Sequence, residues 1–134
     1  AEDGRVVFAR FGLPGERVRV QVTGQRSTLI RGDVVEVLSN PSEHRVDFVW
    51  PEAGPLGVGG ADLGHVAFDY QAEWKSHVLA TAIGRIGGRD LQGHFAERGL
   101  SPRVAALPGD AETSGWATRT RIEFVVGEDG RPAM

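Results

Sequence analysis

The sequence is organised around residues Trp50–Gly88, which read WPEAGPLGVGGADLGHVAFDYQAEWKSHVLATAIGRIGG. The first part of this stretch is rich in glycine and proline, a composition that disfavours regular secondary structure. From Asp69 onward, apolar residues recur at the three- and four-residue spacing of a helix. Asp69 suits the N-cap of that helix, and Gly87-Gly88 suits its end. The stretch therefore predicts a rigid loop leading into a capped helix, although the loop alone also fits an ordinary connector.

Composition limits the kinds of protein that this chain can be. It has 134 residues, of which 40% are hydrophobic, enough for one domain or two very small ones. No run approaches the ~20 apolar residues of a membrane span, so no membrane partner is expected. The chain has no cysteine, which excludes disulfides, thiolate metal ligands and a cysteine nucleophile, and which fits a cytoplasmic protein.

Charge is unevenly distributed along the chain. The net charge of −3 argues mildly against a dedicated nucleic-acid binder, since attraction to phosphates needs a basic surface. Residues 1–38 nevertheless hold six arginines against five acidic residues, whereas residues 39–134 hold nine basic and thirteen acidic residues. Any basic face should therefore belong to the front of the chain.

Three strands are predicted in that front part, over Arg5–Phe11, Arg17–Val22 and Leu29–Leu38. The strict alternation of Arg17–Val22 directs its valines inward and its polar residues, Arg17, Arg19 and Gln21, to solvent. Proline and glycine at residues 13–16 predict a tight turn between the first two strands. Short strands joined by tight turns favour a small barrel, because closure hides the strand edges.

The back part is predicted to be mixed. The residue pattern indicates a helix over Asp90–Arg98, a strand over Arg103–Leu107, a turn at Pro108–Asp110, a strand over Trp116–Val126 and a hairpin turn at Gly127–Gly130. We expect the segment after that turn to be too short for a return strand.

Three blocks of sequence, in the same order, resemble the RNA uracil-C5 methyltransferase family. The run Arg5–Arg10 with Leu13–Val20 is similar to the TRAM domain, a small OB-like RNA-binding barrel. Trp50-Pro51, Val58–Ala61, Gly64-His65 and Gln71–Lys75 are similar to the segment of that family that binds an iron–sulfur cluster. Leu107–Asp110 with Trp116–Arg121 resembles the start of its central domain.

The resemblance implies a mainly β fold with some α. A small OB-like TRAM β-barrel over residues 1–49 would be followed by a glycine-rich loop, a long helix and a partial α+β central domain over residues 50–134. The residues that the resemblance and the charge pattern together offer as RNA contacts are Arg5, Arg10, Arg17, Arg19, Arg31, Arg119 and Arg121. The front arginines also fit a solubilising face, and Arg119 and Arg121 also fit ion pairs with a neighbouring strand. OB-like RNA binders usually stack bases on exposed aromatic rings. Phe8 and Phe11 are the candidates here, and either fits the core equally well.

The cluster-binding segment lacks the residues that hold a cluster. Relatives use thiolates there, but the matching positions are Trp50, Val58 and Ala61. The resemblance thus implies the loop without the iron–sulfur cluster. We expect these three side chains to converge on one apolar cluster in the vacated volume.

Gln71 and Lys75 fall on the apolar arc of the predicted helix, one turn apart. A buried ammonium needs a partner or a path to water along its stem. Both alternatives stay open: the side chains reach solvent, or they hydrogen-bond carbonyl groups of the loop over residues 51–61.

The family's chemistry needs groups that this chain lacks. Methylation at uracil C5 needs a thiolate nucleophile and S-adenosylmethionine as the methyl donor. We therefore interpret the chain as the N-terminal RNA-recognition part of a tRNA or rRNA methyltransferase, truncated before the catalytic domain and inactive alone. No cofactor is expected in this chain, and S-adenosylmethionine is the cofactor of the full-length parent. RNA is the expected partner, not DNA. The alternative is a free-standing OB-like RNA-binding module.

Overall fold

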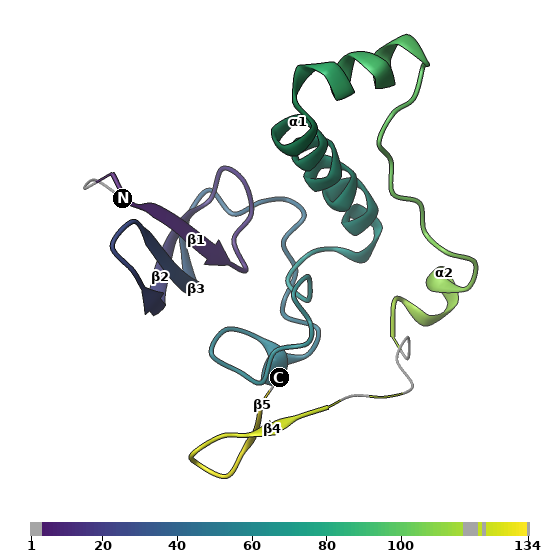
Figure 1. Ribbon diagram of the computed structural model, residues 1–134. Helices are drawn as coiled ribbons and strands as arrows, with labels where there is room; N and C mark the ends of the chain where they lie inside the picture. Colours follow the sequence, from purple (N-terminus) through teal and green to yellow (C-terminus); the bar gives the residue numbers. More distant parts are fainter. Residues whose placement is uncertain (1–3, 117–120, 122, 134) are drawn as a thin grey trace. The chain divides into compact units, whose positions relative to one another are not determined.

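The computed structural model describes residues 4–116, 121 and 123–133 (Figure 1). They form two compact units, one made of the residues up to Ala67 together with those from Arg121 on, and the other beginning at Phe68. The elements are β1 (Val6–Arg10), β2 (Arg17–Gln25), β3 (Leu29–Ser39), α1 (Gln71–Glu97), α2 (Asp110–Thr113), β4 (Val125–Val126), β5 (Pro132–Ala133), and short 3₁₀ helices at Pro51–Ala53 and Phe68–Tyr70. No helix in the described part of the chain is long and apolar enough to cross a membrane.

The first three strands form one mixed sheet in the order β1-β3-β2. Strand β1 pairs in parallel with β3, whereas β2 pairs antiparallel with β3 and carries three register irregularities. The three strands predicted in the front are confirmed, with β2 three residues longer than expected. The described residues show an open three-stranded sheet, so closure into a barrel stays a proposal.

The hydrophobic core of the first unit lies between this sheet and the segment that follows it. Val18 and Val20 are partly buried, as the alternation predicts, but Val22 is 53% exposed, because the irregularity between Val22 and Gly24 disturbs the alternation. The buried apolar side chains are Phe11, Leu13, Ile30, Val34, Ala53 and Val66. Two of these come from the loop, so the loop is part of the core rather than a connector.

Backbone hydrogen bonds connect the residues just before the loop to its far end. Val46 N–H donates to the His65 carbonyl and Val49 N–H to the Gly64 carbonyl, each at 3.0 Å. The expectation that no regular structure occurs in this loop is wrong at Pro51–Ala53, which forms a 3₁₀ turn with proline at its start. Proline is tolerated there because the first N–H of a helix needs no partner within it.

The long helix is present, with a break at the expected place. Gly88 has φ +66°, a left-handed conformation that interrupts α1, and the chain changes direction there (Figure 1). Two predictions are therefore confirmed. The first helical part of α1 stops at Gly87-Gly88, and a second helical part follows where a helix was predicted over Asp90–Arg98. The predicted cap is wrong, because Asp69 lies inside the 3₁₀ helix Phe68–Tyr70. Tyr70 occupies the N-cap without a side-chain cap bond.

The back part differs most from expectation. The segment Arg103–Leu107 is not a strand; its Val104 N–H donates to the Ser76 hydroxyl of α1 at 2.8 Å, which replaces a strand partner. The turn at Pro108–Asp110 leads into the short helix α2.

Most described residues of the strand predicted over Trp116–Val126 are not in a strand. Only Val125–Val126 is a strand among its described residues, and residues 117–120 and 122 lie outside the described part. The expectation that no return strand follows is wrong, because Pro132–Ala133 pairs with Val125–Val126. The Gly127 N–H donates to the Arg131 carbonyl, and this bond closes the tight turn that brings the two strands together.

Candidate functional site

Of the seven arginines predicted to contact RNA, four lie in the front sheet and Arg5 directly precedes it. Arg5 precedes β1, Arg10 ends β1, Arg17 and Arg19 lie in β2, and Arg31 lies in β3. The sheet therefore carries four of these arginines, with Arg5 next to its first strand. Their surroundings differ, and these differences decide which of them can offer charge to a ligand.

Arg10 is committed to a structural ion pair. Its Nε and Nη2 donate to the two carboxylate oxygens of Asp33 at 2.8 and 2.9 Å, and Asp33 is 1% exposed. The Leu56 N–H donates to the same carboxylate at 3.2 Å. The bonds from Arg10 hold the pKa of Asp33 below its ordinary value. Asp33 therefore neutralises Arg10 and ties the sheet to the loop.

Arg19 is also paired, but at the surface. It donates to Glu36 on the adjacent strand, and both side chains are largely exposed. Such a pair contributes little to stability in water, and it cancels most of the charge that Arg19 would offer to a phosphate.

Arg17 and Arg31 are the arginines best placed to contact an anion. Both are exposed, and no side-chain hydrogen bond or ion pair engages either of them within the described residues. Arg5 is half-buried and already has an interaction partner. Arg121 is exposed outside any strand, and Arg119 lies outside the described residues. The charge available on the sheet is thus smaller than the count of arginines suggests.

A second ion pair, which sequence reasoning missed, joins the sheet to the segment after it. Arg45 Nε and Nη2 each donate to the Glu16 carboxylate at 2.6 Å, and Nη2 also donates to the Phe11 carbonyl at 2.8 Å. The Leu13 and Ser42 N–H groups donate to the same carboxylate at 2.9 and 3.1 Å. The Glu16 side chain is fully buried.

The bond from Arg45 is the main reason that the pKa of Glu16 falls to about 2, from an ordinary value of 4.5. Two backbone N–H donors lower it further, against the opposing effect of burial. Glu16 therefore stays ionised at neutral pH and works as a structural anchor rather than as an acid or base. No feature of the sequence pointed to this role, because a glutamate after proline and glycine has the pattern of a solvated turn residue.

His65, from the glycine-rich segment, is buried in an aromatic cluster. Its ring stacks on Phe48 at a centroid distance of 6.1 Å and meets Phe11 edge-on at 5.7 Å. Burial, followed by the nearby charge of Arg45, lowers the pKa of His65 to about 4. Its Nδ1 is buried without a hydrogen-bond partner in the described part of the chain. His65 is therefore neutral at pH 7.

Three positions of this chain match cysteines in the family that it resembles, and all three are half-buried. Trp50, Val58 and Ala61 lie outside any strand or helix, and Val58 N–H donates to the Glu52 carbonyl at 2.9 Å. Indole, isopropyl and methyl groups cannot ligate iron, so these residues do not fit an iron–sulfur cluster. No group of three or more His, Asp or Glu side chains in the described part of the chain could hold a metal ion. The convergence of the three side chains on one cluster stays a prediction.

Gln71 and Lys75 lie in the first turns of α1. Gln71 is half-buried and has an interaction partner, and Lys75 is exposed. The exposure of Lys75 fits the alternative in which its ammonium reaches solvent. Their proposed bonds to the loop carbonyls stay a prediction.

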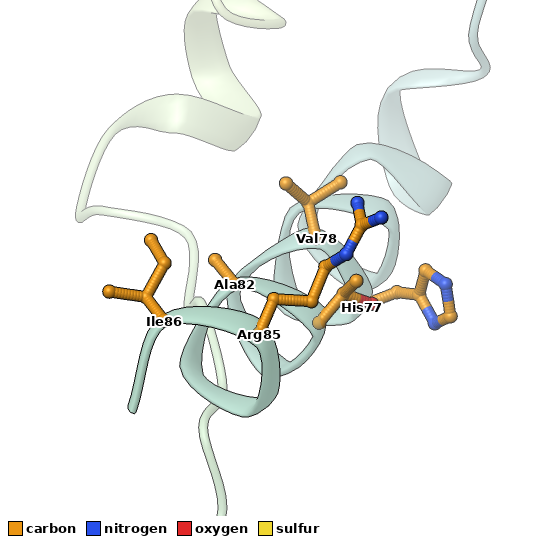
Figure 2. Close-up of a pocket in the computed structure, with 6 residues that line it drawn as sticks. His77, Val78, Ala82, Arg85 and Ile86 are labelled. Atoms are coloured by element: carbon orange, nitrogen blue, oxygen red, sulfur yellow. The ribbon is translucent and has the colours of Figure 1, made fainter. Parts of the chain in front are cut away.

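The same helix carries an open apolar hollow of about 590 Å³. Figure 2 shows Val78, Ala82 and Ile86 following one another along α1, with the Arg85 side chain beside them. The lining residues are His77, Val78, Thr81, Ala82, Arg85 and Ile86. This surface offers apolar area and one cation, but no arrangement of acid, base and nucleophile.

Comparisons with known proteins give a family. An uncharacterized RNA methyltransferase of Bifidobacterium longum is 42% identical over 98% of this chain, and one of Streptomyces coelicolor is 35% identical over 98%. The 23S rRNA (uracil(1939)-C(5))-methyltransferase RlmD of Acinetobacter baumannii is 36% identical over 89% of this chain.

The match covers only part of each relative. The chain spans 30%, 29% and 23% of the lengths of these three proteins, respectively. No family model matches the chain, and no solved structure matches it. The chain is therefore a segment homologous to the N-terminal part of the RNA methyltransferases, a family that includes uracil-C5 methyltransferases of 23S rRNA.

Proposed function

We propose that this chain is the RNA-recognition part of an S-adenosylmethionine-dependent RNA uracil-C5 methyltransferase acting on rRNA or tRNA in the cytoplasm. The observation that carries the proposal is the front sheet, where Arg17 and Arg31 are exposed and have no acidic partner among the described residues. The similarity to RlmD supports RNA as the partner.

The proposal includes a division of labour along the chain. Residues 1–49 would form a TRAM-like barrel that contacts RNA, and residues 50–134 would form the start of a central domain. The Arg10–Asp33 pair fits this division, because Asp33 also accepts a bond from the Leu56 N–H of the loop and uses neither Arg17 nor Arg31. Arg121 is exposed and would extend the contact with RNA.

Contacts between scattered arginines and the phosphate backbone of RNA give affinity with little preference for the base sequence. We expect the Arg17→Glu/Arg31→Glu variant to bind unrelated single-stranded RNAs more weakly than the unmodified chain, by similar factors. The slope of log affinity against log salt should become shallower by about 1.4, since each neutralised phosphate on a single strand contributes about 0.7. Fluorescence anisotropy with labelled oligonucleotides at several salt concentrations measures both effects.

The matched control is Arg89→Glu/Arg98→Glu, which makes the same change in net charge at exposed positions of the other unit. Its affinity for RNA should stay close to that of the unmodified chain. Equal losses in both double variants would show a general charge effect and would contradict the front sheet as the RNA-binding face.

The chain itself is expected not to bind S-adenosylmethionine. Its glycine-rich segment forms tight turns rather than a strand–loop–helix for a nucleotide. Because the chain also has no cysteine for the attack on C6, we do not expect it to methylate RNA either. Calorimetric titration of the purified chain with the cofactor should give no heat beyond dilution. Binding in the micromolar range would contradict the assignment of the donor site to another part of the parent enzyme.

A further inference from the structure

One aromatic ring of the front sheet is mostly exposed to solvent. Phe8 of β1 is 59% exposed, whereas Phe11, three residues later, is 5% exposed. A phenylalanine ring gains free energy when it is covered, and its flat face suits another ring. Phe8 therefore offers a surface for a ligand rather than a contribution to the core.

The strand register places Phe8 beside a cation. In the parallel pairing of β1 with β3, Phe8 is the partner of Arg31 and Arg10 is the partner of Asp33. We call each set of partners across the strands a row, and no irregularity of register separates these two rows. Residues in register lie on the same face of a sheet, on strands about 4.8 Å apart. The Phe8 and Arg31 side chains thus leave the same face of the sheet from adjacent strands.

The two rows differ in charge. In the Arg10–Asp33 row the acid neutralises the arginine. In the Phe8–Arg31 row no acid is present, and no hydrogen bond or ion pair of the Arg31 side chain occurs among the residues described. The Phe8–Arg31 row therefore keeps its full positive charge for an anion.

The third member of this row leaves room for a ligand. Across β3 from Phe8, Gly24 of β2 is the partner of Arg31. A methyl group placed on Gly24 would meet no atom within 4 Å, so the space above it is open. The row thus combines a flat apolar ring, an unpaired cation and open space.

We propose that Phe8 and Arg31 form a stacking platform for one nucleotide of single-stranded RNA, with the base on the Phe8 ring and a flanking phosphate on Arg31. An aromatic ring stacks on any base, and a neighbouring guanidinium complements the phosphate charge. The base must be unpaired, because bases inside a duplex already stack on each other and expose no face. This inference rests on the proposed function and adds to it the site and the form of RNA that is bound.

The test uses an RNA oligonucleotide that carries the fluorescent base 2-aminopurine, whose emission falls when the base stacks on a ring. We expect Phe8→Leu and Phe8→Ala to weaken binding by about 5- to 100-fold and to remove the quenching, in line with the loss of one stacked base. Phe8→Trp should retain both. Leucine is the informative variant, since it keeps apolar area but has no π face.

A second measurement separates the base from the phosphate. Removing the bases from the oligonucleotide should abolish the difference between the unmodified chain and Phe8→Leu. Arg31→Gln should instead reduce the salt slope by about 0.7 and leave residual quenching. A difference that persists on the abasic RNA would contradict stacking.

The outcomes also separate this platform from the proposed function. If Phe8→Leu binds RNA as tightly as the unmodified chain while the Arg17→Glu/Arg31→Glu variant does not, the platform is wrong and the RNA-binding face stands. If the unmodified chain binds no RNA at all, both proposals are overturned. Circular dichroism should show an unchanged fold for every Phe8 variant, because the ring is exposed.

Discussion

Replacing Arg45 by methionine is expected to lower the free energy of unfolding by about 3–5 kcal/mol, the usual cost of removing one partner of a buried ion pair. The Glu16 carboxylate is fully buried and takes two charged hydrogen bonds from Arg45. Without them it keeps only the Leu13 and Ser42 amides. The variant also leaves the Phe11 carbonyl without its bond from Arg45.

The matched control makes the same substitution in the exposed pair. Arg19→Met breaks the ion pair with Glu36, whose side chains are both largely exposed, and should change stability by less than about 1 kcal/mol. Urea unfolding followed by circular dichroism measures both variants. A cost for Arg45→Met no larger than that for Arg19→Met would show that the Glu16–Arg45 pair does not anchor the segment after β3.

The same pair predicts how stability depends on pH. The pKa of Glu16 is about 2 in the folded protein and 4.5 ordinarily, so the folded state favours the ionised form. The resulting stabilisation, about 3 kcal/mol, is fully present above pH 4.5 and is lost as the pH falls from 4.5 toward 2. Asp33, whose pKa is also lowered, acts in the same direction. Arg45→Met should reduce this acid dependence.

The elements that the sequence predicted correctly are those with local signals. Alternating valines and turn residues located the three strands of the front sheet, and paired glycines located the break in α1. The order β1-β3-β2 has no such signal, because parallel pairing of β1 with β3 joins residues more than twenty positions apart. The same is true of the Glu16–Arg45 pair, whose partners are 29 residues apart.

The failures in the back part have a different cause. The run Arg103–Leu107 has strand-like composition, but its Val104 N–H bonds a serine hydroxyl of α1 instead of a strand. Composition indicates that a segment can be extended; only a neighbouring strand with free N–H and carbonyl groups makes it part of a sheet. That neighbour cannot be read from the segment itself.

The two candidate RNA-stacking rings show the limit of sequence reasoning at the site. Phe8 and Phe11 occur in the same apolar run, and their composition does not say which is buried. The structure separates them because Phe11 has φ +65°, a left-handed conformation that is rare for a bulky residue. The chain turns there, and the Phe11 ring enters the core against Phe48, with ring centroids 5.4 Å apart.

Phe11→Ala is therefore expected to lower the free energy of unfolding by about 3–5 kcal/mol, the range for removing a large buried ring. The ring is 5% exposed and contacts both Phe48 and His65, and the Arg10 guanidinium lies over it at 5.0 Å. Alanine does not relieve the left-handed backbone, so no gain offsets the lost packing. Phe8→Ala removes the same atoms three residues earlier.

The two variants should give opposite results in two measurements. Phe8→Ala should unfold within about 1 kcal/mol of the unmodified chain, because its ring is 59% exposed, and yet lose affinity for single-stranded RNA. Phe11→Ala should lose stability, and where it remains folded it should keep the quenching of a stacked 2-aminopurine. If Phe8→Ala proves as destabilising as Phe11→Ala, both rings belong to the core, and the front sheet would have to bind RNA through its arginines alone.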